Sequence, residues 1–307
     1  MRLGLIGAGR WGRNYIRTIT ELDHVRLARL ASRNPESASL VPAGCEISAA
    51  WRDVLDPSTI DGVIVATPPS LHAEMARAAL DARLPVLVEK PLTLDVGEAR
   101  ALQKLVASRG GFVMVDHTHL FHPAFRKLKQ LLPEFGPIRA IRSEAGNYGP
   151  FRPDVPVLWD WGAHDVAMCL DLVGVAPVEV QGRRLETRKL GGNRGEIVEL
   201  NLRFPNLVVA EIRIGNMMSK RRWFMVQFDA AALIYDDLAS SKLVLRRGSS
   251  PRLPEEGQGE AISITGELPL ENVVREFALR IRSGTTDSSC LDFAVGVVEI
   301  LSRCDWR

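Results

Sequence analysis

Residues 1–12 read MRLGLIGAGRWG and contain a G-x-G-x-x-G motif directly after an apolar run at residues 3–6. A strand before this motif and a helix after it form the context in which it cradles a dinucleotide pyrophosphate. The first glycine permits a tight turn, the second lets the backbone approach the phosphates, and the third lets helix and strand pack closely. The helix N-terminus adds free N–H groups and a partial positive charge. A glycine turn without a ligand is the alternative. The expected cofactor contacts are Gly7, Ala8, Gly9, Arg10, Trp11 and Gly12.

Short apolar runs alternate with amphipathic helical stretches up to about residue 120. The expected strands are residues 3–6, 25–31, 62–66, 86–88 and 112–115. The expected helices are residues 11–20, 70–82 and 95–108, with Ser70 and Asp95 as N-caps. Continuously apolar strands separated by helices predict a parallel sheet that is covered on both faces. Right-handed crossovers then give a doubly wound α/β Rossmann domain, which we place at residues 1–120.

The pattern changes after residue 120. Strand-like stretches with alternating apolar and polar residues dominate, which predicts a largely antiparallel sheet with one buried and one open face. Helices are expected at residues 123–132, 164–172, 270–281 and 291–302, and a loop at residues 248–260. We therefore expect a second domain of the α+β class over residues 121–307.

The end of the second expected strand bears on the choice of cofactor. An acidic residue about 20 positions beyond the last glycine would hold the ribose hydroxyls of NAD. Ser32 occupies that position and is followed by Arg33, so there is no carboxylate. Because an arginine pairs well with a 2′-phosphate, the sequence favours NADP over NAD. The alternative is that Arg33 stacks on the adenine or faces the solvent.

Three further segments complete a family pattern. They are Ala66-Thr67-Pro68-Pro69 with His72, the triplet Glu89-Lys90-Pro91, and Asp160 with His164 in a D-x-x-x-H spacing. With them the whole chain resembles the glucose–fructose oxidoreductase, inositol dehydrogenase and MocA family of NAD(P)-dependent oxidoreductases. The resemblance implies that Lys90 reaches the reaction centre, that the last helix packs back on the first domain, and that the protein is a homodimer or homotetramer. The further expected cofactor contacts are Ala66, Thr67, Pro68, His72, Glu89 and Lys90.

Oxidation of an alcohol requires hydride transfer to nicotinamide and loss of the hydroxyl proton. Histidine suits the second task best, so His164 is the expected acid–base. Lys90 is expected to donate a hydrogen bond to the substrate oxygen, or to take the proton itself. Asp160, four residues before His164, lies on the same helix face and is placed to orient the histidine, the lysine or a sugar hydroxyl. The alternative for His164 is a core histidine whose hydrogen bonds are satisfied within the protein. The alternative for Lys90 is a structural ion pair. Glu89 is expected to have a structural role.

Polar and aromatic side chains precede this pair. Residues 147–154 read NYGPFRPD, and residues 159–161 read WDW. Sugar rings stack on aromatic side chains, and arginine binds carboxylate or phosphate groups. The run resembles members of the family that act on nucleotide-linked sugars, and the alternative is an irregular loop packed by its own aromatic residues. The expected substrate contacts are Lys90, His119, Tyr148, Arg152, Trp159, Asp160 and His164.

Three histidines lie close together in the sequence at positions 117, 119 and 122. Their spacing matches no zinc motif, so we expect no metal. Because the segment follows the last expected strand of the first domain, the family resemblance implies that it borders the substrate pocket. The sequence leaves two interpretations open. Either one of these histidines contacts the substrate, or all three only pack within the protein.

The bulk composition excludes other classes of partner. The formal net charge is +2 over 307 residues and there is no long basic run, so neither nucleic acid nor a membrane surface is expected. The short clusters Arg183-Arg184 and Lys220-Arg221-Arg222 are interpreted as solvated surface. The four cysteines are far apart, and the first strand leaves no room for a signal peptide. We therefore expect a cytoplasmic protein.

The sequence thus predicts an NAD(P)-dependent dehydrogenase or reductase. Its substrate would be a secondary hydroxyl of a sugar, of a nucleotide-linked sugar or of a polyol. Two alternatives are open. One is a redox-assisted sugar lyase or glycosidase that retains its cofactor, and the other is a regulator that senses a sugar or cofactor without chemistry.

Overall fold

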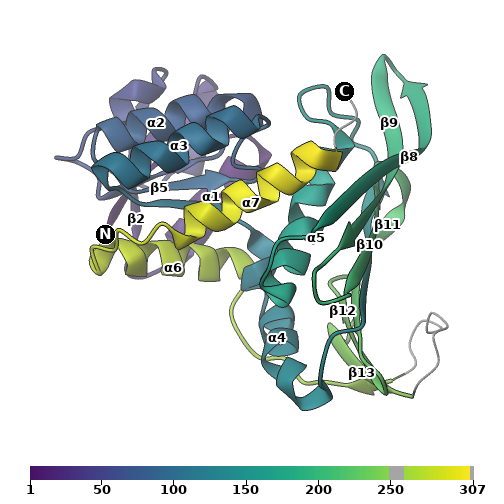
Figure 1. Ribbon diagram of the computed structural model, residues 1–307. Coiled ribbons are helices and arrows are strands. Elements are labelled where there is room, and N and C mark those ends of the chain that lie inside the picture. The colour runs from purple at the N-terminus through teal and green to yellow at the C-terminus, as the bar shows by residue number, and fades with distance from the viewer. Residues whose placement is uncertain (249–258, 305–307) are drawn as a thin grey trace. The chain divides into compact units, whose positions relative to one another are not determined.

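The computed structural model describes residues 1–248 and 259–304 of the chain (Figure 1). These residues form two compact units. Unit 1 comprises Met1–Thr118 and Leu268–Val298, and unit 2 comprises His119–Glu267 and Glu299–Arg307. Most of the loop expected at residues 248–260 lies outside the described residues.

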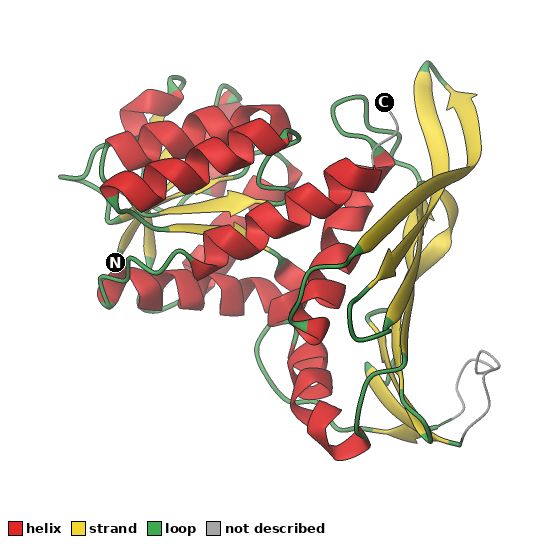
Figure 2. Cartoon of the chain, in the orientation of Figure 1, coloured by secondary structure: helices red, strands yellow, loops and turns green. Residues whose placement is uncertain are grey.

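Unit 1 is built on a six-stranded parallel sheet, shown in yellow at the left of Figure 2. Strands β4, β5 and β6 are buried along their whole length, as their continuously apolar sequences predict. The strand order reverses between β1 and β4, which is the doubly wound arrangement and confirms the predicted Rossmann fold. In spatial order the strands are β3 (Glu46–Ser48), β2 (Arg26–Ala31), β1 (Arg2–Ile6), β4 (Gly62–Val65), β5 (Val86–Glu89) and β6 (Val113–Asp116).

Helices cover both faces of this sheet. Helices α2 (His72–Asp81) and α3 (Val96–Arg109) lie together on one face, and α1 (Arg10–Glu21) and α6 (Pro269–Arg282) lie on the other (Figure 1). Helix α6 presses closely on β4, because a Cβ atom at Gly62 would lie 2.6 Å from the Cδ1 atom of Ile281. The last helix, α7, spans Ser289–Cys304, and short 3-10 turns occupy Pro35–Leu40, Trp51–Val54, Pro69–Leu71 and Thr118–Phe121.

The two predicted helix caps have different outcomes. Asp95 caps α3 as expected, since its side chain accepts a hydrogen bond from the backbone N–H of Glu98 at 2.9 Å. The prediction for Ser70 is wrong. Helix α2 begins only at His72, after a 3-10 turn that opens with Pro69, and no side chain caps it. The fixed φ of proline favours this tight turn, and Ser70 is its middle residue.

Unit 2 is built on an eight-stranded sheet whose neighbouring strands are antiparallel except for the parallel pair β7 and β10. Helices α4 (Pro123–Phe135) and α5 (Val157–Val173) pack on one face (Figure 1). Alternate residues of β10 are buried and exposed, as predicted for a sheet with one open face. In spatial order the strands are β14 (Glu260–Ala261), β13 (Leu243–Arg247), β12 (Ala231–Asp236), β11 (Met217–Gln227), β7 (Ala140–Tyr148), β10 (Val209–Gly215), β9 (Asn193–Arg203) and β8 (Glu179–Leu190).

Helix α5 begins at Val157, two turns before the expected start at residue 164. This places Asp160 and His164 on one continuous helix. Across residues 1–248 and 259–304, every helix is too short or too polar to cross a lipid bilayer.

Candidate active site

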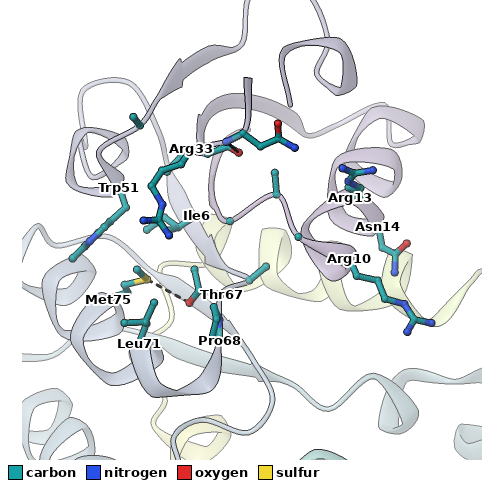
Figure 3. Close-up of a pocket in the computed structure, with 18 residues that line it drawn as sticks. Ile6, Arg10, Arg13, Asn14, Arg33, Trp51, Thr67, Pro68, Leu71 and Met75 are labelled. Carbon is teal, nitrogen blue, oxygen red and sulfur yellow. Dashed lines mark hydrogen bonds between the residues drawn. The ribbon is translucent and has the colours of Figure 1, made fainter. Parts of the chain in front are cut away.

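A cleft of about 1140 Å³ opens in unit 1 at the carboxyl ends of three parallel strands (Figure 3). Ile6 and Ala31 end β1 and β2, Ala66 follows β4, and all three line the cleft. Doubly wound folds bind their ligands at this place, where the strand order reverses. The other lining residues are Gly7, Ala8, Gly9, Arg10, Arg13, Asn14, Ser32, Arg33, Asn34, Ala49, Trp51, Thr67, Pro68, Leu71 and Met75.

The three glycines of the motif have different structural roles. Gly7 has a φ of +101°, and a Cβ atom there would lie 2.5 Å from the carbonyl oxygen of Ala66. A Cβ atom at Gly12 would lie 2.0 Å from the carbonyl oxygen of Gly7, so both positions are fixed by packing of the backbone. Gly9 is exposed, and a Cβ atom there would meet no atom of the described residues within 4 Å. Gly9 therefore leaves space on the side of the cleft rather than inside the protein.

The N-terminus of α1 also faces this cleft, because its first residue, Arg10, lines it. Gly9 is the N-cap, no side chain caps the helix, and the first turn has no acidic residue. Free N–H groups and the helix dipole at an open glycine turn suit a pyrophosphate group. The residues present therefore fit a dinucleotide.

Positive charge dominates the cleft. Arg10, Arg13 and Arg33 line it, and no Asp or Glu does so among the described residues. Arg33 extends back toward the cleft on the same side as Trp51 (Figure 3). The guanidinium of Arg52 covers the Trp51 ring at 4.1 Å. The hydroxyl groups of Ser32 and Ser37 are 2.7 Å apart, so Ser32 is held in place within its own loop.

His72 joins the loops that follow β4 and β5. Its Nδ1 atom lies 2.9 Å from the carbonyl oxygen of Pro91, and its Nε2 atom lies 2.9 Å from that of Thr67. Burial lowers the pKa of His72. A neutral ring donates one of these two bonds at a time. His72 thus fixes the loop that carries Lys90, and none of Trp11, Gly12, His72, Glu89 and Lys90 lines the cleft itself.

In unit 2, Asp160 and His164 lie one turn apart on α5, as their spacing predicts. Arg152 forms an ion pair with Asp160 at 3.4 Å and with Asp154 at 2.5 Å. The guanidinium of Arg152 holds the pKa of Asp154 below its usual value. Arg152 is therefore held between two carboxylates of this unit.

The His164 ring belongs to a histidine cluster, which we define as His119, His122, His164, Tyr235 and Asp237. The rings of His119 and His164 meet edge to face, with centroids 4.9 Å apart. The Nδ1 atom of His119 lies 3.1 Å from the hydroxyl of Tyr235, and the Nε2 atom of His122 lies 3.2 Å from Asp237. Burial alone would raise the pKa of Asp237, but the hydrogen bond from His122 and the two nearby histidines lower it. Within the part of the chain that the structure describes, no group of three or more His, Cys, Asp or Glu side chains is arranged to hold a metal ion.

Arg222 is a neighbour of α5 that the sequence interpretation missed. Its guanidinium lies 4.2 Å from the Trp161 ring centroid and donates a hydrogen bond to the carbonyl oxygen of Gly146 at 2.8 Å. The side chain is half-buried, and burial lowers its pKa. The interpretation as solvated surface is therefore wrong for Arg222, because pairing of β11 with β7 brings it to Gly146.

Two of the expected substrate residues lie at opposite extremes of exposure. Tyr148, at the end of β7, is 72% exposed, and its ring meets that of Phe151 edge to face at 5.5 Å. Trp159 is 1% exposed and packs in the core of unit 2. Trp161, two residues further along α5, is the tryptophan that Arg222 covers.

Comparisons with known proteins identify the family. The sequence profile of the Gfo/Idh/MocA oxidoreductase family, which has an NAD-binding Rossmann fold, matches residues 1–117. The crystal structure of a provisionally assigned oxidoreductase from Magnetospirillum magnetotacticum MS-1 is 45% identical in sequence, covers 99% of each chain, and superposes with a TM-score of 0.94. The chain belongs to the Gfo/Idh/MocA family. The cleft of unit 1 lies within the residues that match this family's NAD-binding Rossmann fold.

Two curated relatives carry the names of nucleotide-sugar enzymes. UDP-N-acetylglucosamine 3-dehydrogenase of Acidithiobacillus ferrooxidans is 34% identical over 190 residues, which are 59% of this chain and 57% of the relative. dTDP-3,4-didehydro-2,6-dideoxy-alpha-D-glucose 3-reductase of Saccharopolyspora spinosa is 25% identical over 299 residues, which are 93% of this chain and 89% of the relative. The match therefore spans little more than half the length of the first of these relatives.

Among the residues that line the cleft of this Gfo/Idh/MocA protein, sequence reasoning missed Arg13, Asn14 and Trp51. The first two lie one turn after Arg10 on α1, so the helical period could have found them. Trp51 had no such signal, because it lies in a short 3-10 turn after an unpredicted strand, β3.

Proposed function

We propose that this protein transfers a hydride between a nicotinamide dinucleotide and a secondary hydroxyl group of a sugar, with nucleotide-linked sugars as the preferred class. The cleft of unit 1, with its open glycine turn and three arginines, is the observation that carries the proposal. The bound cofactor would supply or accept the hydride. The two relatives named for reactions on nucleotide sugars support the substrate class.

In this proposal, three residues position the substrate, stabilise charge and transfer the proton. Lys90, which is 9% exposed, donates a hydrogen bond to the substrate oxygen and stabilises the negative charge that develops there. His164 takes the hydroxyl proton in oxidation and returns it in reduction. Asp160, ion-paired with Arg152, orients the sugar hydroxyls, and His119 and Tyr148 contribute further substrate contacts.

We propose NADP as the preferred cofactor. Ser32 and Arg33 lie in the cleft directly after β2, where a 2′-phosphate would meet an arginine and no carboxylate. NAD would lose this charge-assisted contact but would keep the glycine turn.

Thermal-shift measurements with purified protein test the cofactor and the substrate class together. At equal concentrations NADP should raise the melting temperature more than NAD does, since stabilisation grows with the ratio of ligand concentration to Kd and reaches about 2.7 kcal/mol at about 100 times Kd. A nucleotide sugar added to the NADP complex should raise it further. An equal response to free polyols and none to nucleotide sugars would contradict the substrate class.

Turnover by single variants tests the residue roles. Lys90→Ala and His164→Ala should each lower kcat by about 10²- to 10⁴-fold with the sugar found by thermal shift. Lys104→Ala and His24→Ala are matched controls, because both side chains are exposed in unit 1 and outside the cleft. Full turnover in both active-site variants would refute the assignment.

The two alternative functions give different results in the same assay. A redox-assisted lyase would keep its cofactor bound and convert the sugar without net reduction of added NADP. A sensor would bind cofactor and sugar, and would show no conversion of either. Product analysis by mass spectrometry alongside nicotinamide absorbance separates the three.

We further propose a homodimer or homotetramer that forms through the open face of the eight-stranded sheet. Helices α4 and α5 cover the other face of this sheet. Light scattering on the purified protein should give two or four times the chain mass, and a monomer at all concentrations would contradict the proposal.

A further inference from the structure

Two acidic side chains lie next to each other inside unit 1. Glu89 and Asp116 are the last residues of the neighbouring parallel strands β5 and β6, and they are paired in register. Their exposed fractions are 5% and 0%. Two carboxylates this close in a buried environment do not both stay ionised, because burial and mutual repulsion favour the neutral form.

The hydrogen bonds around the pair show which member carries the charge. The hydroxyl of Tyr15 donates to Oδ2 of Asp116 at 2.5 Å, and the hydroxyl of Thr118 donates to Oδ1 at 2.7 Å. Donors on both oxygens stabilise the ionised form of Asp116. Glu89 has one buried carboxyl oxygen, Oε1, without a hydrogen-bond partner among the described residues. Burial and the charge of Asp116 raise the pKa of Glu89 well above its usual value.

Lys90 is the positive group beside this pair. It follows Glu89 directly and is 9% exposed. Burial raises the pKa of both carboxyl groups, and the charge of Lys90 acts in the opposite direction on each. The groups that face the pair from the other elements are Tyr15 of α1 and Thr118, which follows β6. The pKa of the buried His117 falls to about 3 through burial and the charge of Lys90, so this histidine is neutral.

We propose that Glu89 and Asp116 share one proton and carry one negative charge between them, and that this buried anion is the positioning group for Lys90. The proposal rests on the proposed function of Lys90 and deepens it. Lys90 is held in its orientation because its counterion is fixed inside the sheet. The hydrogen bond from Tyr15 to Asp116 connects the pair to α1. The N-terminus of this helix lies at the cleft of unit 1.

Infrared spectroscopy of the folded full-length chain tests this without any substrate. With glutamate labelled by ¹³C at its side-chain carboxyl, the wild type should show the C=O stretch of a protonated carboxylic acid at neutral pH. The band should be absent in Glu89→Gln. In the wild type, this band should disappear as the pH rises. The midpoint of its disappearance is the pH at which the pair releases its shared proton. A wild type that lacks the band at neutral pH overturns the shared proton.

The lysine variants test the coupling between Lys90 and the pair. Lys90→Met should move the midpoint of the band upward by about 1–3 pH units, because the cation that favours ionisation is gone. Lys90→Arg, which keeps the charge, should restore a midpoint close to that of the wild type. Lys104→Met is the matched control, because Lys104 is exposed on helix α3, and it should leave the midpoint unchanged. Coupling is reciprocal, so an unmoved midpoint in Lys90→Met means that the pair does not hold the lysine and overturns the proposal.

Tyr15→Phe is a second variant, and it preserves the packing of the ring. Removal of the donor to Asp116 should also move the midpoint upward, and an unchanged midpoint would exclude Tyr15 from the arrangement. None of these spectra depends on turnover. A protein that shows the predicted midpoints but converts no sugar would refute the proposed function alone.

Discussion

Arg33 is the single side chain on which the proposed preference for NADP rests. It lines the cleft directly after β2, where an acidic residue would select NAD. Arg33→Ala should weaken NADP binding by about 10- to 100-fold, the effect of about 1.5–3 kcal/mol for a charged hydrogen bond. NAD binding should change little. Titration calorimetry with both cofactors checks this, with Arg109→Ala at an exposed ion pair as the control. Equal losses for NAD and NADP would place Arg33 against a group that both cofactors share.

Among single residues, the sequence predicts those whose position follows from counting along the chain. It misses those whose neighbours come from strands that are distant in the sequence. Ser32 and Arg33 follow from their count beyond the glycine motif, and both line the cleft. Arg222 is interpreted as surface because its neighbours in the chain are charged. Its actual neighbours are Gly146 on β7 and Trp161 on α5, and only the pairing of β11 with β7 brings them together.

The turn between β1 and α1 gives a prediction at the scale of an element. Gly12→Ala forces a Cβ atom against the backbone of Gly7, which cannot move aside, so we expect an unstable or unfolded protein. Gly9→Ala meets no atom within 4 Å and has an ordinary φ of −69°, so stability should be nearly unchanged. Its methyl group should nevertheless weaken dinucleotide binding, because it occupies the side on which the backbone approaches the phosphates. Urea unfolding and cofactor titration on the two variants should separate these effects.

Elements with strong local signals were predictable, and those that depend on tertiary packing were less so. The five apolar runs of the parallel sheet and the Asp95 cap follow from sequence alone. Strands β3, β13 and β14 lack the continuously apolar sequence of β4–β6, since β3 reads EIS, β13 ends in two arginines and β14 reads EA. The first turns of α5 were missed because they contain two tryptophans and follow a proline-rich loop that hides the helical period.

The stability of the whole molecule should depend on pH through His117. Burial and the charge of Lys90 lower its pKa to about 3, whereas an unfolded histidine titrates near 6.5. Between these values only the unfolded chain binds the proton. The free energy of unfolding therefore falls as the pH drops below about 6.5, by up to about 1.4 kcal/mol per pH unit from this group.

His117→Phe should remove this part of the acid sensitivity. It keeps an aromatic ring against Phe293, and the two ring nitrogens have no hydrogen-bond partner among the described residues. Urea midpoints of variant and wild type should differ more in favour of the variant at about pH 5 than at about pH 7. A difference that does not change with pH would mean that His117 has the same pKa in the folded and the unfolded chain.

Unit 1 is assembled from two stretches of chain, and the second begins only at Leu268. Phe277 of that stretch is fully buried, stacks on Phe112 at a centroid distance of 6.3 Å, and packs beside Gly62. A ribosome that has completed the parallel sheet has therefore not yet made the helix that covers β4. At synthesis rates of about 5–20 residues per second, the apolar surface of β4 that this helix covers stays exposed for on the order of ten seconds. We therefore expect nascent chains to be prone to aggregation during that interval, and a product truncated before residue 268 to remain so.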